Sequence, residues 1–249
     1  MDDIPTSSPI ASVGDLWRAG IDAVLLDGLG TLVALEPPWP RLVKRLRDAH
    51  GVELSSADAE RAFRAEIAFY RTHHHEGRDP RALEDLRRRC AEVLRAQLPP
   101  HAVEALSREQ LTAAMLDSLR FSAYPDAPDA LARLRARGLT LVVVSNWDIS
   151  LPAVLRSVGL ERMVDGAVTS AEVGHPKPAR EIFTAALTLA GCAPGSAVHV
   201  GDSLDQDIRG ARAAGIPAVL LRRDNARPGE PSPGVPSISS LAQLLPPLG

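Results

Sequence analysis

A short apolar run that stops at one carboxylate constrains the fold of this chain more than any other feature. Ala23-Val24-Leu25-Leu26 has the composition of a buried strand, and Asp27 follows it directly. Gly28 and Gly30 then permit a turn that most residues cannot make. Open α/β sheets bind ligands at the carboxyl ends of their strands, which predicts Asp27 at such an edge. Asp27 is then either a nucleophile or the first residue of an ordinary turn.

The second half of the chain alternates strand-like and helix-like segments. The apolar runs 139–146, 166–170, 197–201 and 218–221 read as strands, and helical patterns cover 129–137, 151–158, 179–190 and 205–214. Short helices are predicted at 13–19 and 240–245, with a surface loop at 222–237. This order predicts an α/β fold with a parallel sheet and helices on both faces.

The region between these parts has a different pattern. Pro37, Pro38 and Pro40 break regular structure, and from 41 to 119 the apolar residues recur at helical spacing with no convincing strand. We therefore predict a three-layer, Rossmann-like core made of residues 1–36 and 121–249. Residues 37–120 are predicted to form an inserted α-helical domain.

Composition narrows the class of protein. A net charge of −3 means that the chain has no excess of basic side chains to bind nucleic acid or an anionic membrane. No apolar run is long enough to span a bilayer. Cys90 and Cys192 are too few for a disulfide framework, and their spacing to histidines matches no zinc pattern. We expect a cytoplasmic monomer or homodimer that binds a small molecule, with no nucleic-acid or membrane partner.

Polar residues follow several of the predicted strands. The predicted strand ends and the loops after them contain Asp27, then Ser145 and Asn146, then Lys177, then Asp202 with Asp207 after it. Each has an ordinary alternative as a turn, a surface loop or a helix cap. Together they provide a nucleophile, a hydroxyl, a cation and carboxylates for Mg²⁺, which is the set that phosphoryl transfer requires.

Four motifs resemble those of the haloacid dehalogenase-like hydrolase superfamily, in its form with an inserted α-helical cap. They are residues 26–32, Val144-Ser145-Asn146, residues 172–178 and residues 200–211. The resemblance implies that Asp27 is the nucleophile and that Lys177 pairs with it and with phosphate. It also implies phosphate-binding roles for Ser145 and Asn146, and loop support near phosphate for Thr31. Mg²⁺ would be held by Asp27, Asp202 and the Leu29 carbonyl, with Asp207 in support.

Leu29 departs from the phosphatase pattern of that superfamily, which has a general acid at this position. The superfamily's 2-haloacid dehalogenases also lack this acid, but they lack the Gly201-Asp202 pair as well. Its phosphonoacetaldehyde hydrolases use a cap lysine, and the one cap lysine here, Lys44, is better explained as a helix-surface residue. Asp148 or the histidines at 73–75 are alternative proton donors, although a helix cap for Asp148 and a solvated loop for the histidines explain them better.

These observations predict a Mg²⁺-dependent hydrolase of a small phosphorylated metabolite, acting through an aspartyl-phosphate on Asp27. Two alternatives stay open. One is hydrolysis of a carbon-halogen or carbon-phosphorus bond, and the other is a weakly active protein with a binding or scaffold role.

Overall fold

The computed structural model describes residues 12–18, 20–223 and 234–245. Its main sheet has six strands in the order β5-β4-β1-β6-β7-β8, and every neighbouring pair is parallel. The strands are β1 (Ala23–Leu26), β4 (Thr140–Ser145), β5 (Gly166–Thr169), β6 (Ala197–Gly201), β7 (Ala218–Leu221) and β8 (Ser237–Ile238). The predicted parallel sheet is confirmed.

The register of the sheet brings the polar strand ends together. On β1, Leu26 is aligned with Val143 of β4 and with Val200 of β6. Asp27 continues the pairing with β6, because its backbone N–H donates to the carbonyl of Val200 at 2.9 Å. The residues that follow β1, β4 and β6 therefore leave the sheet at the same edge, with β1 in the middle.

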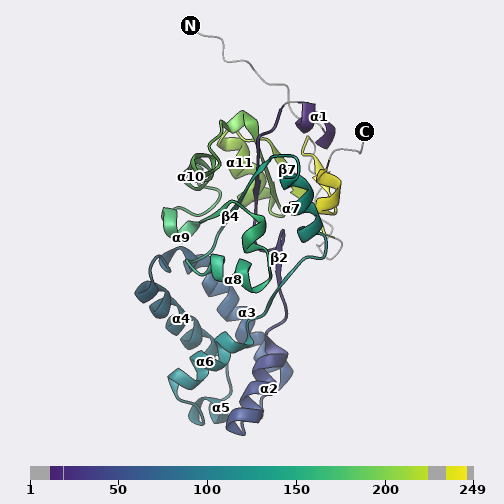
Figure 1. Cartoon of the computed structure of the whole chain (residues 1–249). Coiled ribbons are helices and arrows are strands. Elements are labelled where there is room, and N and C mark those ends of the chain that lie inside the picture. Colours follow the sequence, from purple (N-terminus) through teal and green to yellow (C-terminus); the bar gives the residue numbers. More distant parts are fainter. Residues whose placement is uncertain (1–11, 19, 224–233, 246–249) are drawn as a thin grey trace.

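Helices cover both faces of the sheet. Val24 and Leu26 pack into an apolar cluster with helices on one face, while Ala23 and Leu25 point into the cluster on the other. The first face carries α1 (Val13–Arg18), α7 (Ala127–Arg135) and α8 (Leu151–Ser157). The second carries α10 (Arg180–Ala190), α11 (Gly210–Ala213) and the short α9 (Ser170–Val173). In Figure 1, α10 and α11 lie on one side of the strands and α7 on the other.

Residues 39–118 form a group of helices with an apolar cluster of their own, here called the helical segment. Phe63, Leu94 and Met115 are among its fully buried side chains. Side chains of Ser55, Asp79 and Ser107 cap three of its helices by accepting hydrogen bonds from the first turn. Its elements are α2 (Trp39–His50), α3 (Ser56–His73), the 3₁₀-helix η1 (His74–Glu76), α4 (Pro80–Arg95), α5 (Pro100–Glu104) and α6 (Arg108–Ser118). In Figure 1 these helices lie together at one end of the molecule.

The helical pattern predicted for this segment is confirmed, whereas its division from the core into a separate domain stays a prediction. None of the helices in the described ranges is long and apolar enough to cross a bilayer.

Several local elements differ from the predictions. The strands β2 (Val33–Leu35) and β3 (Phe121–Ala123) form an antiparallel ribbon that joins the two ends of the helical segment to the core. At three residues each, they are too short for the sequence pattern to detect. The predicted helix 205–214 is a π-helical segment, η4 (Leu204–Arg209), followed by α11. The last predicted helix is a 3₁₀ turn, η5 (Leu241–Leu244). The strand β8 begins at the last residue of the predicted tail loop, and residues 224–233 of that loop are outside the described ranges.

One carboxyl group is buried inside the helical segment. Glu66 on α3 is 5% exposed, and burial raises its pKa to about 7, although a hydrogen bond with the Cys90 thiol acts in the opposite direction. Because the folded pKa lies above the unfolded value, the folded state favours the protonated carboxyl. The contribution of Glu66 to stability is therefore fully present below about pH 4.5 and is lost as pH rises to about 7.

We expect Glu66→Gln to remove this pH dependence. Relative to wild type, the variant should gain about 3 kcal/mol in free energy of unfolding between pH 4.5 and 8, by the usual conversion of a pKa shift to free energy. Urea denaturation at a series of pH values measures the difference. Glu84→Gln, at an exposed position on α4, serves as the matched control. Parallel stability curves for wild type and Glu66→Gln would contradict the prediction.

Candidate active site

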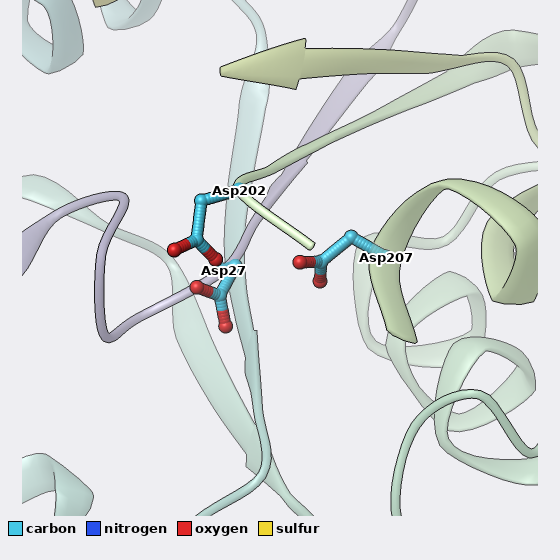
Figure 2. A group of neighbouring side chains, drawn as sticks. All are labelled: Asp27, Asp202 and Asp207. Carbon is cyan, nitrogen blue, oxygen red and sulfur yellow. The ribbon is translucent and has the colours of Figure 1, made fainter. Parts of the chain in front are cut away.

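Three carboxylates meet at the carboxyl edge of the sheet. Asp27 follows β1, Asp202 follows β6, and Asp207 lies on η4. One oxygen from each carboxylate lies within 4.8 Å of the others. Figure 2 shows the Asp27 and Asp202 carboxylates next to each other, with that of Asp207 directed toward them from the helix. Asp27 and Asp207 are buried and Asp202 is exposed, so the cluster opens to solvent on the Asp202 side.

Lys177 joins two of these carboxylates. Its ammonium donates hydrogen bonds to Asp27 Oδ1 and to Asp207 Oδ1, each at 2.6 Å, and its side chain is 1% exposed. Burial opposes its charge, but the carboxylates of Asp207 and Asp27 raise the pKa of the ammonium above its ordinary value. Burial, with the nearby charges of Asp207 and Asp202, raises the pKa of Asp27, while Lys177 works against this shift. Lys177 is therefore the cation that makes this acidic cluster stable.

Asp207 is held by three donors. Besides Lys177, Oδ1 accepts a hydrogen bond from His199 Nε2 at 2.9 Å, and Oδ2 accepts one from the Ser203 backbone N–H at 3.0 Å. Burial would raise the pKa of Asp207, but Lys177 and His199 lower it well below its ordinary value. With both oxygens engaged, Asp207 supports Lys177 rather than offering a free ligand.

His199 was not predicted from the sequence. It lies on β6 with no exposed surface, contacts the ring of Phe183 edge-on, and leaves its Nδ1 without a hydrogen-bond partner among the described residues. A histidine between Val198 and Val200 in an otherwise apolar strand was the available signal, because a buried polar side chain normally has a specific partner.

Glycines allow the carboxylates to approach the backbone. A Cβ atom at Gly201 would lie 2.2 Å from Asp207 Cγ, and one at Gly30 would lie 2.2 Å from Asp202 Oδ2. Gly30 also has φ of 91°, which side chains rarely adopt. Any larger residue at either position would displace an acid of the cluster.

Ser145 is the last residue of β4, and Asn146 follows it beside this cluster. Ser145 is buried, and its hydroxyl lies close to Gly28, where an added Cβ would be 2.9 Å away. The Asn146 amide accepts a hydrogen bond from the Lys177 backbone N–H at 2.7 Å and donates one to the Lys177 carbonyl at 3.1 Å. Asn146 also donates to Gln206, which the sequence analysis did not single out. The contacts of Asn146 thus position the Lys177 loop, and phosphate binding by Asn146 stays a prediction.

The turn after Asp27 leaves one carbonyl available. The N–H groups of Leu32 and Val33 donate to the Gly28 carbonyl, and Gly30 N–H donates to the Val33 carbonyl, all at 2.9 Å. None of these three bonds uses the carbonyl of Leu29, whose side chain is half-buried against the core. Thr31 is fully buried, and its hydroxyl has no hydrogen-bond partner among the described residues.

The end of α3 contacts the edge of the sheet near the acidic cluster. Tyr70 Oη donates a hydrogen bond to Asp148 Oδ2 at 2.8 Å, His74 Nδ1 is paired with Ser170 Oγ at 2.8 Å, and the Ile149 N–H donates to the Gly77 carbonyl at 3.1 Å. Asp148 and Ser170 follow β4 and β5. The helical segment therefore packs on the same edge that carries the carboxylates.

Most of the alternative proton donors have structural partners. Both carboxylate oxygens of Asp148 accept hydrogen bonds, from Tyr70 and from the Ser150 N–H. His73 is paired with the Phe69 carbonyl, and burial lowers the pKa of His74 to about 4. His75 Nδ1 is buried without a partner among the described residues. Lys44 forms an exposed ion pair with Asp48 on α2, as expected for a helix-surface lysine.

The donor atoms at this edge suit a hard divalent cation. Asp27 and Asp202 offer carboxylate oxygens, and Asp202 has no cationic side chain within ion-pair distance among the described residues. Carboxylate oxygens are among the ligands that Mg²⁺ prefers. A further ligand from the Leu29 carbonyl stays a prediction. The cluster fits such an ion because the ion would neutralise the excess negative charge.

Comparison with known proteins places the fold and site in context. Residues 21–215 match the family described as haloacid dehalogenase-like hydrolase. A HAD phosphatase from Thermococcus onnurineus has a similar structure, with a TM-score of 0.61 and 27% identity over 90% of this chain and 96% of that one. The similarity extends over the core and the helical segment, because so much of both chains is covered.

Two curated relatives match a shorter part of the chain. Haloacid dehalogenase-like hydrolase domain-containing protein 3 from Homo sapiens is 41% identical over 125 residues, which are 49% of this chain and 50% of that protein. Phosphoserine phosphatase from Thermus thermophilus is 38% identical over 126 residues, 50% of each chain. The chain thus spans about half the length of the curated relatives it matches. Together with the family match, they confirm the resemblance inferred from the motifs.

Proposed function

The chain belongs to the haloacid dehalogenase-like hydrolase family, and from this premise we propose that it is a Mg²⁺-dependent phosphatase of a small phosphorylated metabolite. The observation that carries the proposal is the Lys177 ammonium held at 2.6 Å from both Asp27 and Asp207. A buried cation beside a nucleophilic carboxylate is suited to binding the phosphoryl group and stabilising its charge during transfer.

In the proposed reaction, a carboxylate oxygen of Asp27 attacks phosphorus, and the bond to the leaving oxygen breaks with its electron pair. The aspartyl-phosphate is then hydrolysed by water, which returns the free carboxylate and phosphate. Lys177 and the Ser145 hydroxyl bind the phosphoryl oxygens, and Asn146 holds the Lys177 backbone in place. Asp207, with His199, keeps Lys177 directed at Asp27.

The proposal includes Mg²⁺, held by Asp27, Asp202 and the Leu29 carbonyl. When bound, it neutralises negative charge on the transferring phosphoryl group. The acidic cluster favours this metal-dependent chemistry over metal-free cleavage of a carbon-halogen bond. Relatives named as phosphatases of phosphoserine, glyceraldehyde 3-phosphate and ribulose-1,5-bisphosphate also favour phosphoryl chemistry.

We further propose that residues 37–120 act as a cap over the acidic cluster. The hydrogen bonds of Tyr70 and His74 to residues after β4 and β5 support this role. Substrate selection would then depend on side chains of the cap.

A substrate screen tests the proposal. Purified protein should release phosphate from at least one class of phosphorylated metabolite, and a chelator should abolish this activity until Mg²⁺ is restored. Turnover of 2-haloacids in excess chelator would instead support dehalogenation. Absence of any turnover across both substrate classes would favour a binding role.

The leucine at position 29 predicts that the rate of hydrolysis depends strongly on the pKa of the leaving group. Without a general acid at this position, aryl and acyl phosphates should be cleaved faster than alkyl phosphates, because the leaving oxygen departs unprotonated. Leu29→Asp should raise alkyl phosphate turnover by about 10²-fold, the lower end of the range for general acid catalysis. The slope of log rate against leaving-group pKa, measured in both proteins, provides the comparison. Equally shallow slopes would mean that wild type already has a proton donor.

A further inference from the structure

An arginine beyond the end of β7 contacts the turn that follows Asp27. This turn, residues 28–33, is here called the Asp27 turn. Arg223 lies two residues after β7, the neighbour of β6 in the sheet. Its Nη2 donates a hydrogen bond to the carbonyl of Thr31 at 2.7 Å. No other side chain in the described ranges donates to a carbonyl of this turn, so Arg223 is the one side chain that holds it in this way.

The same guanidinium binds the connection that returns from the helical segment. Its Nη1 donates to Asp126 Oδ1 at 3.0 Å, and its Cζ lies 3.6 Å from the centre of the Tyr124 ring. The Tyr124 N–H donates to the Leu32 carbonyl at 3.0 Å, so this connection also contacts the Asp27 turn directly. Arg223 therefore joins the turn, the connection and the end of β7 at one point.

Asp126 is itself held by the last part of the described chain. Its Oδ2 accepts hydrogen bonds from the Ser240 hydroxyl at 2.7 Å and from the Leu241 N–H at 2.8 Å. Both carboxylate oxygens of Asp126 are thus engaged, which fixes the group that Arg223 binds. The Arg223 side chain is only 16% exposed, although the sequence predicts a surface loop from residue 222 onward.

Stability alone explains the burial of Arg223 poorly. Its Nε is buried and has no hydrogen-bond partner among the described residues. A buried ion pair contributes little net stability after the loss of water is included, and an unpaired buried N–H lowers it further. A planar guanidinium does, however, fix the relative positions of its partners, because its hydrogen bonds and its stacking have defined directions. These contacts therefore favour a role in the geometry of the turn.

Two acids of the cluster depend on where this turn lies. Asp27 directly precedes it, and the turn passes so close to Asp202 that a Cβ at Gly30 would lie 2.2 Å from Asp202 Oδ2. A shift of the turn would change how these two carboxylates face each other and the substrate. A reacting group that is misplaced by about 1 Å can lose about 10² in rate, so small shifts matter.

We propose that Arg223 is a positioning residue for Asp27. By holding the Thr31 carbonyl, the Tyr124 ring and Asp126 with one guanidinium, it keeps the Asp27 turn in the geometry that phosphoryl transfer requires. This inference rests on the proposed phosphatase function. Arg223 acts on Asp27 through the turn that joins Asp27 to Thr31.

Hydrogen exchange tests whether Arg223 holds the turn, and it does not require activity. In Arg223→Lys, the ammonium retains the charge that pairs with Asp126 but lacks the planar group that also reaches Thr31 and stacks on Tyr124. The amides of residues 28–33 should exchange about tenfold to a hundredfold faster than in wild type, the range for loss of a hydrogen bond to a charged group. Exchange on β4 should stay the same.

Kinetics with p-nitrophenyl phosphate test the consequence for catalysis. Arg223→Lys should lower kcat by about tenfold to a hundredfold because Asp27 is less well oriented, and Arg223→Met should lower it at least as much. KM should change by less than about threefold, since Arg223 does not bind the phosphoryl group. Ser240→Ala is the matched control, because it removes a hydrogen bond to Asp126 from the same network. It should lower the melting temperature and leave kcat within about twofold of wild type.

The outcomes separate the two proposals. Unchanged exchange of residues 28–33 in both Arg223 variants would show that Arg223 does not hold the turn, whatever the activity. Faster exchange throughout the sheet would show a role in global stability, and faster exchange of the turn with unchanged kcat would show that catalysis does not depend on it. Each of these results overturns the inference. If wild type cleaves no phosphomonoester, the proposed function fails and the catalytic role of Arg223 fails with it, whereas exchange still decides whether Arg223 holds the turn.

Discussion

Asp27→Asn should abolish hydrolysis, with a loss of about 10⁴-fold or more, because an amide of the same shape cannot attack phosphorus. The variant should fold normally. Asp27 lies buried beside two other carboxylates, so removal of its charge reduces repulsion within the cluster. Its melting temperature without metal should equal or exceed that of wild type.

The measurement combines turnover, thermal melting and detection of the intermediate. Rapid acid quench followed by mass spectrometry should find covalent phosphate on wild type and none on the variant. Asp205→Asn is the matched control, since Asp205 is an exposed acid on η4 that pairs with Arg209. Activity of the Asp27→Asn protein at a tenth or more of the wild-type rate would disprove the nucleophile assignment.

Lys177→Met should affect both stability and catalysis. The substitution leaves Asp27 and Asp207 buried without their shared cation, and breaking a buried pair in this way costs about 3–5 kcal/mol. Loss of one donor to the phosphoryl group should lower kcat by about 10²- to 10³-fold. Denaturant unfolding of metal-free protein measures the first effect and steady-state kinetics the second.

The chain supplies its own control for this experiment, because Lys44 is the one other lysine in the sequence. Lys44 is exposed and pairs with Asp48 on the surface of α2, so Lys44→Met should change stability by no more than about 0.5 kcal/mol. The double variant Lys177→Met/Asp27→Asn should recover part of the lost stability, because one of the two unpaired charges is removed. Equal stability of wild type and Lys177→Met would refute the role given to this lysine.

The sequence pattern predicted the elements whose physical basis is local. The strands β1, β4, β6 and β7 are continuous apolar runs, and each was predicted within one or two residues of its observed ends. Asp27, Lys177, Asp202 and Asp207 were predicted to converge because the ends of parallel strands meet at one edge, and the structure brings them together.

Features that depend on contacts distant in sequence were not predicted. His199 interrupts an apolar strand, but its partner is identified only once Asp207 is known to fold back beside β6. Tyr70 appeared as one more apolar position of a helix, yet its hydroxyl donates to Asp148, 78 residues away. The ribbon of β2 and β3 is too short to produce a pattern, since each strand depends on the other for its hydrogen bonds.

The placement of the helical segment also has a consequence for folding kinetics. Ala23 on β1 is paired with Thr140 on β4, so these two neighbouring strands meet only after the chain closes a loop of more than a hundred residues. The intervening helices make mainly local contacts and have their own apolar cluster, so they are able to form early. In the folded structure, the pairing of β2 with β3 holds the two ends of this loop together next to the sheet. If the helices and the β2-β3 pair form first, the flexible chain that β1 and β4 must close is much shorter than the number of residues between them.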